Sequence, residues 1–212
     1  MPALGFRWLT PLYDTVVRAS TKERTFKHAR IEQAHNRPQQ RVQDLGCGTG
    51  TLAIWVKQQR PEAEVTGTYA DRDVLRLALR KADQASVSVR FDQAFAERLP
   101  YRDAVFDRVV SSLFFHHLSW QAKLDAAREA FRVLKQGGEL YVADWGGPTN
   151  ALMRALFLSI QLLDGFANTR DHVRGKLASI FEQAQFVQVG TVRTFSTVFG
   201  TIALYRAVKP AS

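Results

Sequence analysis

The sequence predicts an α/β fold: a doubly wound, seven-stranded, mostly parallel sheet with helices on both faces and an antiparallel C-terminal strand. Short apolar runs rich in β-branched residues alternate five times with helical patterns along the 212 residues. Such alternation is typical of parallel sheets covered by helices. Two long alternating runs then close the chain as a strand pair. No linker, repeat or low-complexity segment stands out, so we expect a single domain over residues 1–212.

The five parallel strands are expected where β-branched and apolar residues lie between turn signals. They are placed at Arg41 to Leu45, Glu64 to Tyr69, Val87 to Asp92, Val105 to Ser112 and Glu139 to Trp145. Apolar residues at helical spacing place the intervening helices at Thr51 to Arg60, Asp71 to Ala85 and Trp120 to Leu134. Pro61 stops the first of these helices, and Gly137-Gly138 is expected to end the third.

The remaining elements flank this alternation. Residues 8 to 35 are predicted to form two helices. Two more helices are expected near Ala151 to Asp164 and His172 to Ala184. The closing strands are placed at Phe186 to Phe195 and Val198 to Val208, antiparallel to each other.

Composition limits the class of protein. Apolar residues make up 46% of the chain and charged residues 23%, as in ordinary globular domains. The lone cysteine, Cys47, excludes an intrachain disulfide and favours a reducing compartment. Residues 1–20 lack the features of a signal peptide, and the apolar stretch Ala151 to Phe166 is shorter than the ~20 residues of a spanning helix. We therefore expect a cytoplasmic protein without a membrane span.

The formal net charge of +9 would suit a nucleic acid or another anionic partner. The basic residues are scattered, however, and no run of five or more like charges occurs. This pattern favours a solvated basic surface over a polyanion contact, which stays open as the alternative.

A glycine-rich turn follows the first strand. Gly46, Gly48 and Gly50 come directly after Asp44-Leu45 and before the helix at Thr51. Glycine permits positive φ angles and close approach of a ligand, and the N-terminus of the helix offers unpaired N–H groups. Ligands of parallel sheets bind at the carboxyl ends of the strands. The turn therefore predicts a nucleotide-like ligand, although a dinucleotide fingerprint would place the third glycine one residue later.

Residues 44–50, Asp-Leu-Gly-Cys-Gly-Thr-Gly, resemble the first motif of the class I S-adenosylmethionine-dependent methyltransferases. Residues 96–107, His116-His117-Leu118 and residues 131–138 resemble further motifs of the ubiquinone/menaquinone-biosynthesis-like branch (methyltransferase type 11), and Leu12-Tyr13-Asp14 resembles its N-terminal motif. The motifs follow in the right order over residues 12–145. The resemblance implies a Rossmann-like domain, S-adenosyl-L-methionine as cofactor, and methyl transfer to a small-molecule acceptor.

The resemblance also implies a cofactor site. The glycine turn would hold the methionine part, with Asp44 near its amino group; an acid and bare backbone suit an ammonium and a carboxylate. Asp44 serving only as a strand-end cap is the alternative. The implied cofactor-binding residues are Asp44, Gly46, Cys47, Gly48, Gly50, Tyr69, Ala70, Asp71, Phe95, Ala96, Ser111 and Tyr13.

Two positions depart from the family pattern. Tyr69 stands where relatives carry the acid that binds both ribose hydroxyls, and a phenol cannot accept two hydrogen bonds from a diol in the same way. Asp71 or a water could compensate, or cofactor binding is weakened or lost. Phe95 stands where many relatives have an Asp that reads the adenine. It could wall the adenine pocket, with backbone groups of Phe95 and Ala96 reading the base, or it could be plain core.

The chemistry needs in-line placement of the acceptor, and a base helps if the acceptor must lose a proton. His116 and His117 are the candidate catalytic residues, as base or as groups that orient the acceptor; a structural role is the alternative. As neighbours they should point in different directions, so at most one should face the site. No other ligands lie at a spacing that would make the pair a metal site.

Two flanking segments are assigned to the acceptor side. Residues 1–38, with Tyr13, are expected to form a helical lid, and residues 146–184 a helical cover. The cover's apolar residues indicate either an apolar or aromatic acceptor pocket, or core and homodimer packing. Two other functions stay open: a weakly binding or non-catalytic module, because of Tyr69, and an RNA methyltransferase. Methylation at cytosine carbon is disfavoured because Cys47 belongs to the glycine turn.

Overall fold

The computed structural model describes residues 39–146, 176–197 and 200–211. The predicted N-terminal lid, including Tyr13, lies outside these residues, as do the helix expected near residues 151–164 and most of the acceptor-side cover. No helix of the described part is both long and apolar enough to cross a membrane.

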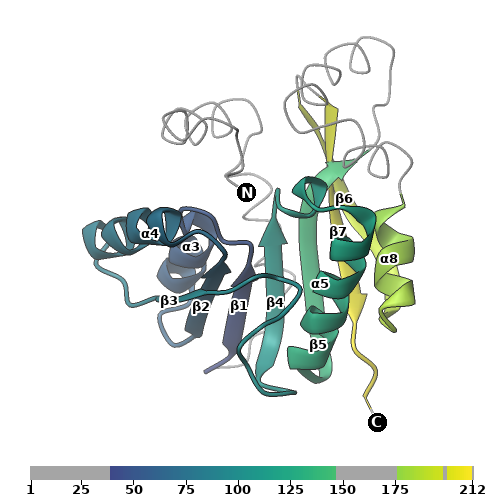
Figure 1. The fold of residues 1–212 in the computed structure, drawn as a ribbon, viewed down its shortest axis with the longest axis horizontal. Helices are drawn as coiled ribbons and strands as arrows, with labels where there is room; N and C mark the ends of the chain where they lie inside the picture. Colours follow the sequence, from purple (N-terminus) through teal and green to yellow (C-terminus); the bar gives the residue numbers. More distant parts are fainter. Residues whose placement is uncertain (1–38, 147–175, 198–199, 212) are drawn as a thin grey trace.

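The described residues form the seven-stranded sheet that the sequence predicts (Figure 1). Its strand order is β3-β2-β1-β4-β5-β7-β6, with the first five strands parallel and β7 antiparallel to both β5 and β6. The strands are β1 (Arg41–Leu45), β2 (Glu64–Tyr69), β3 (Arg90–Gln93), β4 (Phe106–Ser112), β5 (Leu134–Gly146), β6 (Val187–Thr197) and β7 (Gly200–Val208). The order reverses between β1 and β4, which is where ligands bind in open parallel sheets.

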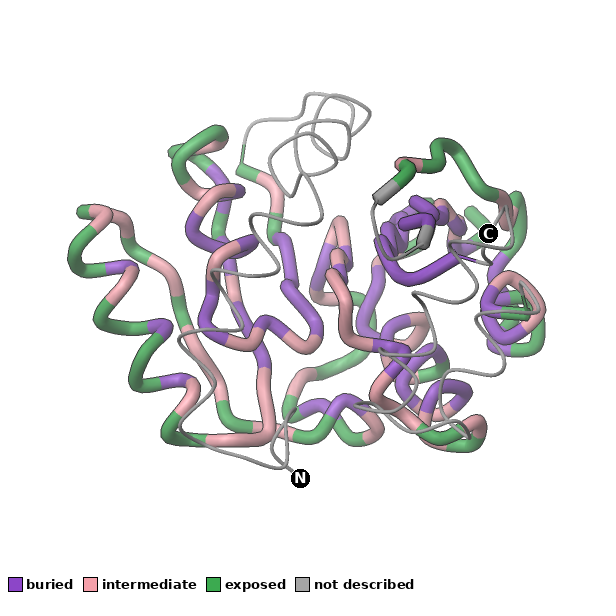
Figure 2. Tube along the Cα trace, turned by 90° about the horizontal axis from the view of Figure 1, so that it is seen from above, coloured by how far each residue is buried: buried purple, intermediate pink, exposed green. Residues whose placement is uncertain are grey.

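Helices lie on both faces of the sheet, as expected. The described helices are α3 (Thr51–Gln59), α4 (Arg72–Gln84), α5 (Trp120–Val133), α8 (Leu177–Gln183) and a 3₁₀ turn, η2 (Phe115–His117). Val42 packs with residues of α3, whereas Leu45 belongs to the cluster that includes α5 and α8. Positions of odd spacing on a strand point to opposite faces, so α3 and α5 cover different sides. Figure 2 shows the buried residues concentrated along the central strands.

Two strands begin three or more residues away from the position that the sequence predicts, and the other shifts at described strand ends are smaller. The third strand begins at Arg90 rather than Val87, because the Val87 N–H donates to the Ala82 carbonyl at 3.1 Å and completes the end of α4. The helix expected to end at the glycine pair ends at Val133, and β5 begins at once with Leu134, which pairs with Phe106 on β4. The first shift comes from a local hydrogen bond at the end of α4, and the second from the pairing of β5 with β4.

The charged residues of the family-like motifs hold the loop that leads to the site. On α5, Arg132 donates to Glu129 and Asp103, and also to the carbonyl oxygens of Leu99 and Tyr101. The Leu99 N–H donates to Glu129 at 2.7 Å. The loop over residues 99–103 is therefore fastened to α5 by both side-chain and backbone bonds.

Candidate cofactor and active site

The glycine turn has the geometry that only glycine adopts readily. Gly46, Gly48 and Gly50 have φ angles of 73°, 51° and 75°, all in the left-handed region. The Thr68 carbonyl on β2 accepts hydrogen bonds from the N–H groups of Gly46, at 3.0 Å, and Cys47, at 3.1 Å. The turn is thus shaped by its own glycines and fixed to the neighbouring strand.

The two ends of this turn differ in their surroundings. A Cβ atom on Gly46 would lie 2.1 Å from Cγ of Phe114, so this glycine is required by close packing as well as by its φ angle. A Cβ atom on Gly48 would meet no atom within 4 Å. The backbone at Gly48 therefore faces open space.

Asp44 is buried at the end of β1 and interacts with the helix beyond the turn. Its Oδ2 accepts a hydrogen bond from the Ala53 N–H at 3.0 Å, in the first turn of α3. Asp44 therefore joins the end of β1 to the first turn of α3; contact with a cofactor stays a prediction. Burial, followed by the charge of Asp44, raises the pKa of the Cys47 thiol, which is buried in the turn. The neutral thiol is the favoured state there.

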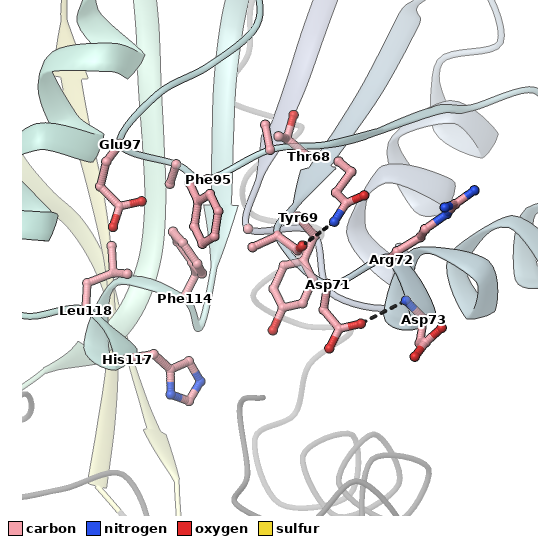
Figure 3. Close-up of a pocket in the computed structure, with 15 residues that line it drawn as sticks. Thr68, Tyr69, Asp71, Arg72, Asp73, Phe95, Glu97, Phe114, His117 and Leu118 are labelled. Carbon is pink, nitrogen blue, oxygen red and sulfur yellow. Dashed lines mark hydrogen bonds between the residues drawn. The ribbon is translucent and has the colours of Figure 1, made fainter. Parts of the chain in front are cut away.

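A cavity of about 520 Å³ opens at the carboxyl ends of the central strands (Figure 3). The segments that line it follow β1, β2, β3 and β4. The lining residues are Gly46, Thr68, Tyr69, Ala70, Asp71, Arg72, Asp73, Gln93, Ala94, Phe95, Ala96, Glu97, Phe114, His117 and Leu118.

One wall of the cavity is polar. Asp71 caps α4, and its Oδ1 accepts hydrogen bonds from the N–H groups of Asp73, at 2.8 Å, and Val74, at 3.3 Å. Its Oδ2 receives no hydrogen bond from the described residues. Burial raises the pKa of the neighbouring Tyr69 phenol, and the charge of Asp71 raises it further. Tyr69 is therefore a neutral hydrogen-bond donor beside a carboxylate.

A chain of hydrogen bonds supports this wall. Gln43 Nε2 donates to Thr68 Oγ1 at 3.2 Å, Thr68 Oγ1 lies 3.0 Å from Tyr101 Oη, and Tyr101 Oη donates to Asp92 at 2.9 Å. Burial is the largest cause of a raised pKa at Tyr101. Because the single hydroxyl proton of Tyr101 is donated to Asp92, Tyr101 Oη acts as an acceptor for Thr68, and the Thr68 hydroxyl is the donor. Thr68 thus holds the glycine turn through its backbone carbonyl and is itself held through its side chain.

The facing wall is aromatic. Phe95 is 65% exposed and lines the cavity, so the alternative that it is plain core is wrong. Phe114 and Leu118 line the same side (Figure 3). Leu113, just before Phe114, has a φ of 51°, and this left-handed residue turns the chain so that the Phe114 ring covers Gly46.

The two candidate histidines point to different places, as expected. His117 lines the cavity, whereas His116 is fully buried. His116 Nδ1 lies 2.7 Å from Oδ1 of Asp144, at the end of β5. The two imidazole rings lie 3.9 Å apart, centroid to centroid. At most one of the two histidines therefore faces the cavity, and it is His117.

The structure brings together about half of the residues predicted for the site. Those that line the cavity are Gly46, Tyr69, Ala70, Asp71, Phe95, Ala96 and His117. Those outside its lining are Asp44, Cys47, Gly48, Gly50, Ser111 and His116. Sequence reasoning missed Thr68, Arg72, Asp73, Gln93, Ala94, Glu97, Phe114 and Leu118. Most of these follow within four residues of a strand end, which is the signal that could have found them.

Comparison with known proteins shows similarity to methyltransferases. A family model described as "Methyltransferase domain" matches residues 42–138. The "Ubiquinone/menaquinone biosynthesis C-methyltransferase" of Ectopseudomonas mendocina is 31% identical over 88% of this chain and 79% of its own length. The "Demethylmenaquinone methyltransferase" proteins of Deinococcus radiodurans and Thermus thermophilus are 32% and 33% identical, over 72% and 68% of this chain. The matches span 63% and 65% of those two relatives.

Solved structures share the fold. The YcgJ protein of Bacillus subtilis superposes with a TM-score of 0.67 at 20% identity, over 88% of this chain and 98% of its own. A SAM-dependent methyltransferase from Methanosarcina mazei gives a TM-score of 0.70 at 19% identity, over 86% and 98%. With the sequence relatives and the glycine turn at the reversal of strand order, these similarities show that the chain belongs to the class I S-adenosylmethionine-dependent methyltransferases, in the branch of the ubiquinone/menaquinone biosynthesis methyltransferases.

Proposed function

We propose that this protein transfers a methyl group from S-adenosylmethionine to a ring carbon of a small aromatic acceptor, a hydroquinone of the demethylmenaquinol type. The observation that carries the proposal is the cavity itself. It joins a polar wall at Tyr69 and Asp71 to an aromatic wall at Phe95 and Phe114, beside the glycine turn. The choice of a quinone-type acceptor rests on the relatives, whose names state ubiquinone, menaquinone or demethylmenaquinone.

The residues present fit S-adenosylmethionine. The backbone at Gly48 faces open space, as a cradle for the amino-acid part of the cofactor requires. Phe95 offers an exposed ring for an adenine to pack against, and the nearby backbone can read its polar edge. Asp71 lines the cavity and uses only Oδ1 in its bonds to the described residues, and Tyr69 adds a phenol. We assign the ribose hydroxyls to these two side chains.

From this assignment, the cofactor and the protein contribute different parts of the reaction. S-adenosylmethionine supplies a methyl group on a positively charged sulfur and leaves as S-adenosylhomocysteine. The chain's contribution is to bind the nucleoside between the two walls and to hold the acceptor in line, which lowers the entropic cost of reaction. The substitution of Tyr69 for the family's acid moves the carboxylate to Asp71, at the cap of α4.

The test combines binding and turnover. Isothermal titration with S-adenosylhomocysteine should give saturable heat, and incubation with methyl-labelled S-adenosylmethionine and a short-chain demethylmenaquinol should give a labelled menaquinol. Label that appears only at oxygen, or only in an added tRNA or rRNA, would contradict the acceptor assignment. Absence of binding heat at millimolar S-adenosylhomocysteine would contradict the cofactor assignment.

A further inference from the structure

We propose that His117 takes the hydroxyl proton of the acceptor, and that His116 and Asp144 are the positioning pair that holds His117 at the cavity. The inference rests on the proposed function, and it assigns different roles to two histidines that are adjacent in the sequence. Sequence reasoning also places Asp144 among the candidates at the strand ends, but its pairing with His116, 28 residues away along the chain, is visible only in the structure.

Asp144 anchors His116 to β5. Asp144 is fully buried, and among the described residues its carboxylate accepts hydrogen bonds from His116 Nδ1 at 2.7 Å, from the His116 N–H at 3.3 Å and from the Trp145 N–H at 2.8 Å. A buried carboxylate is stable only when donors surround it. Because the carboxylate accepts, Nδ1 of His116 is the protonated nitrogen. Both the backbone and the ring of His116 are therefore held by one side chain of β5.

The turn η2, which carries both histidines, is short and is attached to β5. η2 has only three residues, and its own bonds run from the His117 N–H to the Phe114 carbonyl at 3.1 Å and from the Leu118 N–H to the Phe115 carbonyl at 3.0 Å. Just before it, the N–H of Leu113 donates to the Ala143 carbonyl on β5 at 2.8 Å. The turn is thus fastened to two consecutive residues of β5, Ala143 and Asp144. A short turn with few internal bonds depends on such attachments.

His117, unlike His116, is exposed to the cavity. Its ring packs against the anchored ring of His116 and lines the cavity, across the opening from Asp71 in Figure 3. The charged residues that line the same cavity are Asp71, Arg72, Asp73 and Glu97, and Asp144 lies behind His116. An imidazole takes up a proton near neutral pH, which suits a base for a phenolic hydroxyl.

The reaction balances with one base. The acceptor's hydroxyl proton passes to a ring nitrogen of His117. The activated ring carbon forms a bond to the methyl group while the electron pair of the carbon–sulfur bond returns to sulfur. The hydrogen at that ring carbon then leaves as a proton to water, and the oxygen regains its proton from His117. One methyl group replaces one proton, with no change in oxidation state of the acceptor ring.

The activity experiment compares His117→Gln and Asp144→Asn with the surface variant Asp125→Asn, each with demethylmenaquinol as acceptor. His117→Gln should lower kcat by about 100-fold or more, as loss of a general base does, and should abolish the acidic limb of the kcat–pH profile. Asp144→Asn should lower kcat less and displace that limb. Affinity for S-adenosylhomocysteine should stay within about twofold in all three variants. An unchanged kcat and acidic limb in His117→Gln would overturn the proposal.

A second measurement separates this proposal from the proposed function. The His117 ring resonance, assigned by its loss in His117→Gln, is followed by NMR with S-adenosylhomocysteine bound. In Asp144→Asn this resonance should shift and titrate at a different pH, whereas Asp125→Asn should leave it in place. Identical titrations in Asp144→Asn and the unchanged protein would overturn the anchoring. This readout needs no methyl acceptor, so an error in the acceptor's identity leaves it intact.

Discussion

At the scale of single residues, Gly46 connects backbone shape with packing. Its φ of 73° favours glycine, and the Phe114 ring occupies the position of a Cβ atom. Gly46→Ala should lower the free energy of unfolding by about 1–3 kcal/mol through strain and overpacking. It should also weaken binding of S-adenosylhomocysteine. Urea denaturation and isothermal titration measure the two effects.

Gly190→Ala is the matched control for this substitution. A Cβ atom there would meet nothing within 4 Å, and no left-handed φ is required. It should therefore leave both the unfolding free energy and the affinity close to those of the unchanged protein. Equal behaviour of the Gly46 and Gly190 variants would show that the contact with Phe114 does not restrict the turn.

Asp71 has two roles that one substitution can separate. Asp71→Ser keeps an N-cap for α4 but removes the oxygen assigned to the ribose. Affinity for S-adenosylhomocysteine should fall about 10- to 100-fold, since a hydrogen bond to a charged group contributes about 1.5–3 kcal/mol. The melting temperature should change little. Asp83→Asn, near the other end of α4, is the control; the assignment fails if both variants bind equally well.

The residues of the site were only partly predictable. Gly46 and Tyr69 follow from the motif pattern, because short-range spacing places them at strand ends. Phe114 could not be predicted, since its position depends on the left-handed Leu113. The partnership of His116 with Asp144 depends on the pairing of β4 with β5 and cannot be read from local spacing.

At the scale of elements, a buried carboxylate joins three strands. Glu139 on β5 accepts hydrogen bonds from Arg206 on β7 and Tyr141, and forms an ion pair with Arg108 on β4 at 2.8 Å. Glu139→Gln should lower the unfolding free energy by about 3–5 kcal/mol, because removing one partner leaves buried charge uncompensated. Denaturation in urea measures this loss.

The ion pair between Glu64 and Arg41 gives the comparison. Their side chains are 69% and 49% exposed. Glu64→Gln should therefore change the unfolding free energy by no more than about 1 kcal/mol. A similar cost for both glutamates would contradict the view that burial, rather than the charge pair itself, sets the contribution of Glu139.

Element boundaries were predictable where local signals decide them. β1 and β2 have the expected bounds because turn residues frame both runs. β5 begins five residues earlier than expected because Leu134 pairs with Phe106, and a partner distant in sequence leaves no local trace. The glycines at 137 and 138 predict a helix end there, but the helix ends earlier, at Val133, because Leu134 pairs with Phe106.

At the scale of the whole molecule, we expect buried phenols to lower the free energy of unfolding at alkaline pH. Burial raises the pKa of Tyr205 to about 12, and burial also raises the pKa values of Tyr101 and Tyr141. Between the unfolded pKa of about 10 and these higher values the folded state binds more protons, so stability falls as pH rises. The slope should reach about 1.4 kcal/mol per pH unit for each tyrosine.

Chemical denaturation between pH 8 and pH 11 checks this expectation. The unfolding free energy should be flat at the lower end of the range and should decline toward the upper end. Tyr205→Phe should make the decline shallower, because one of the titrating groups is removed. A free energy that stays constant to pH 11 would contradict the assignment.

The strand order also determines when the sheet can be completed during synthesis. β7 lies between β5 and β6, although it leaves the ribosome after both. Until residues 200–208 emerge, β5 has an unpaired edge, and every residue from Leu140 to Trp145 is buried in the finished protein. Exposed apolar edges recruit other chains. We therefore expect a nascent chain that stalls within β6 to bind chaperones or to aggregate until β7 pairs with β5.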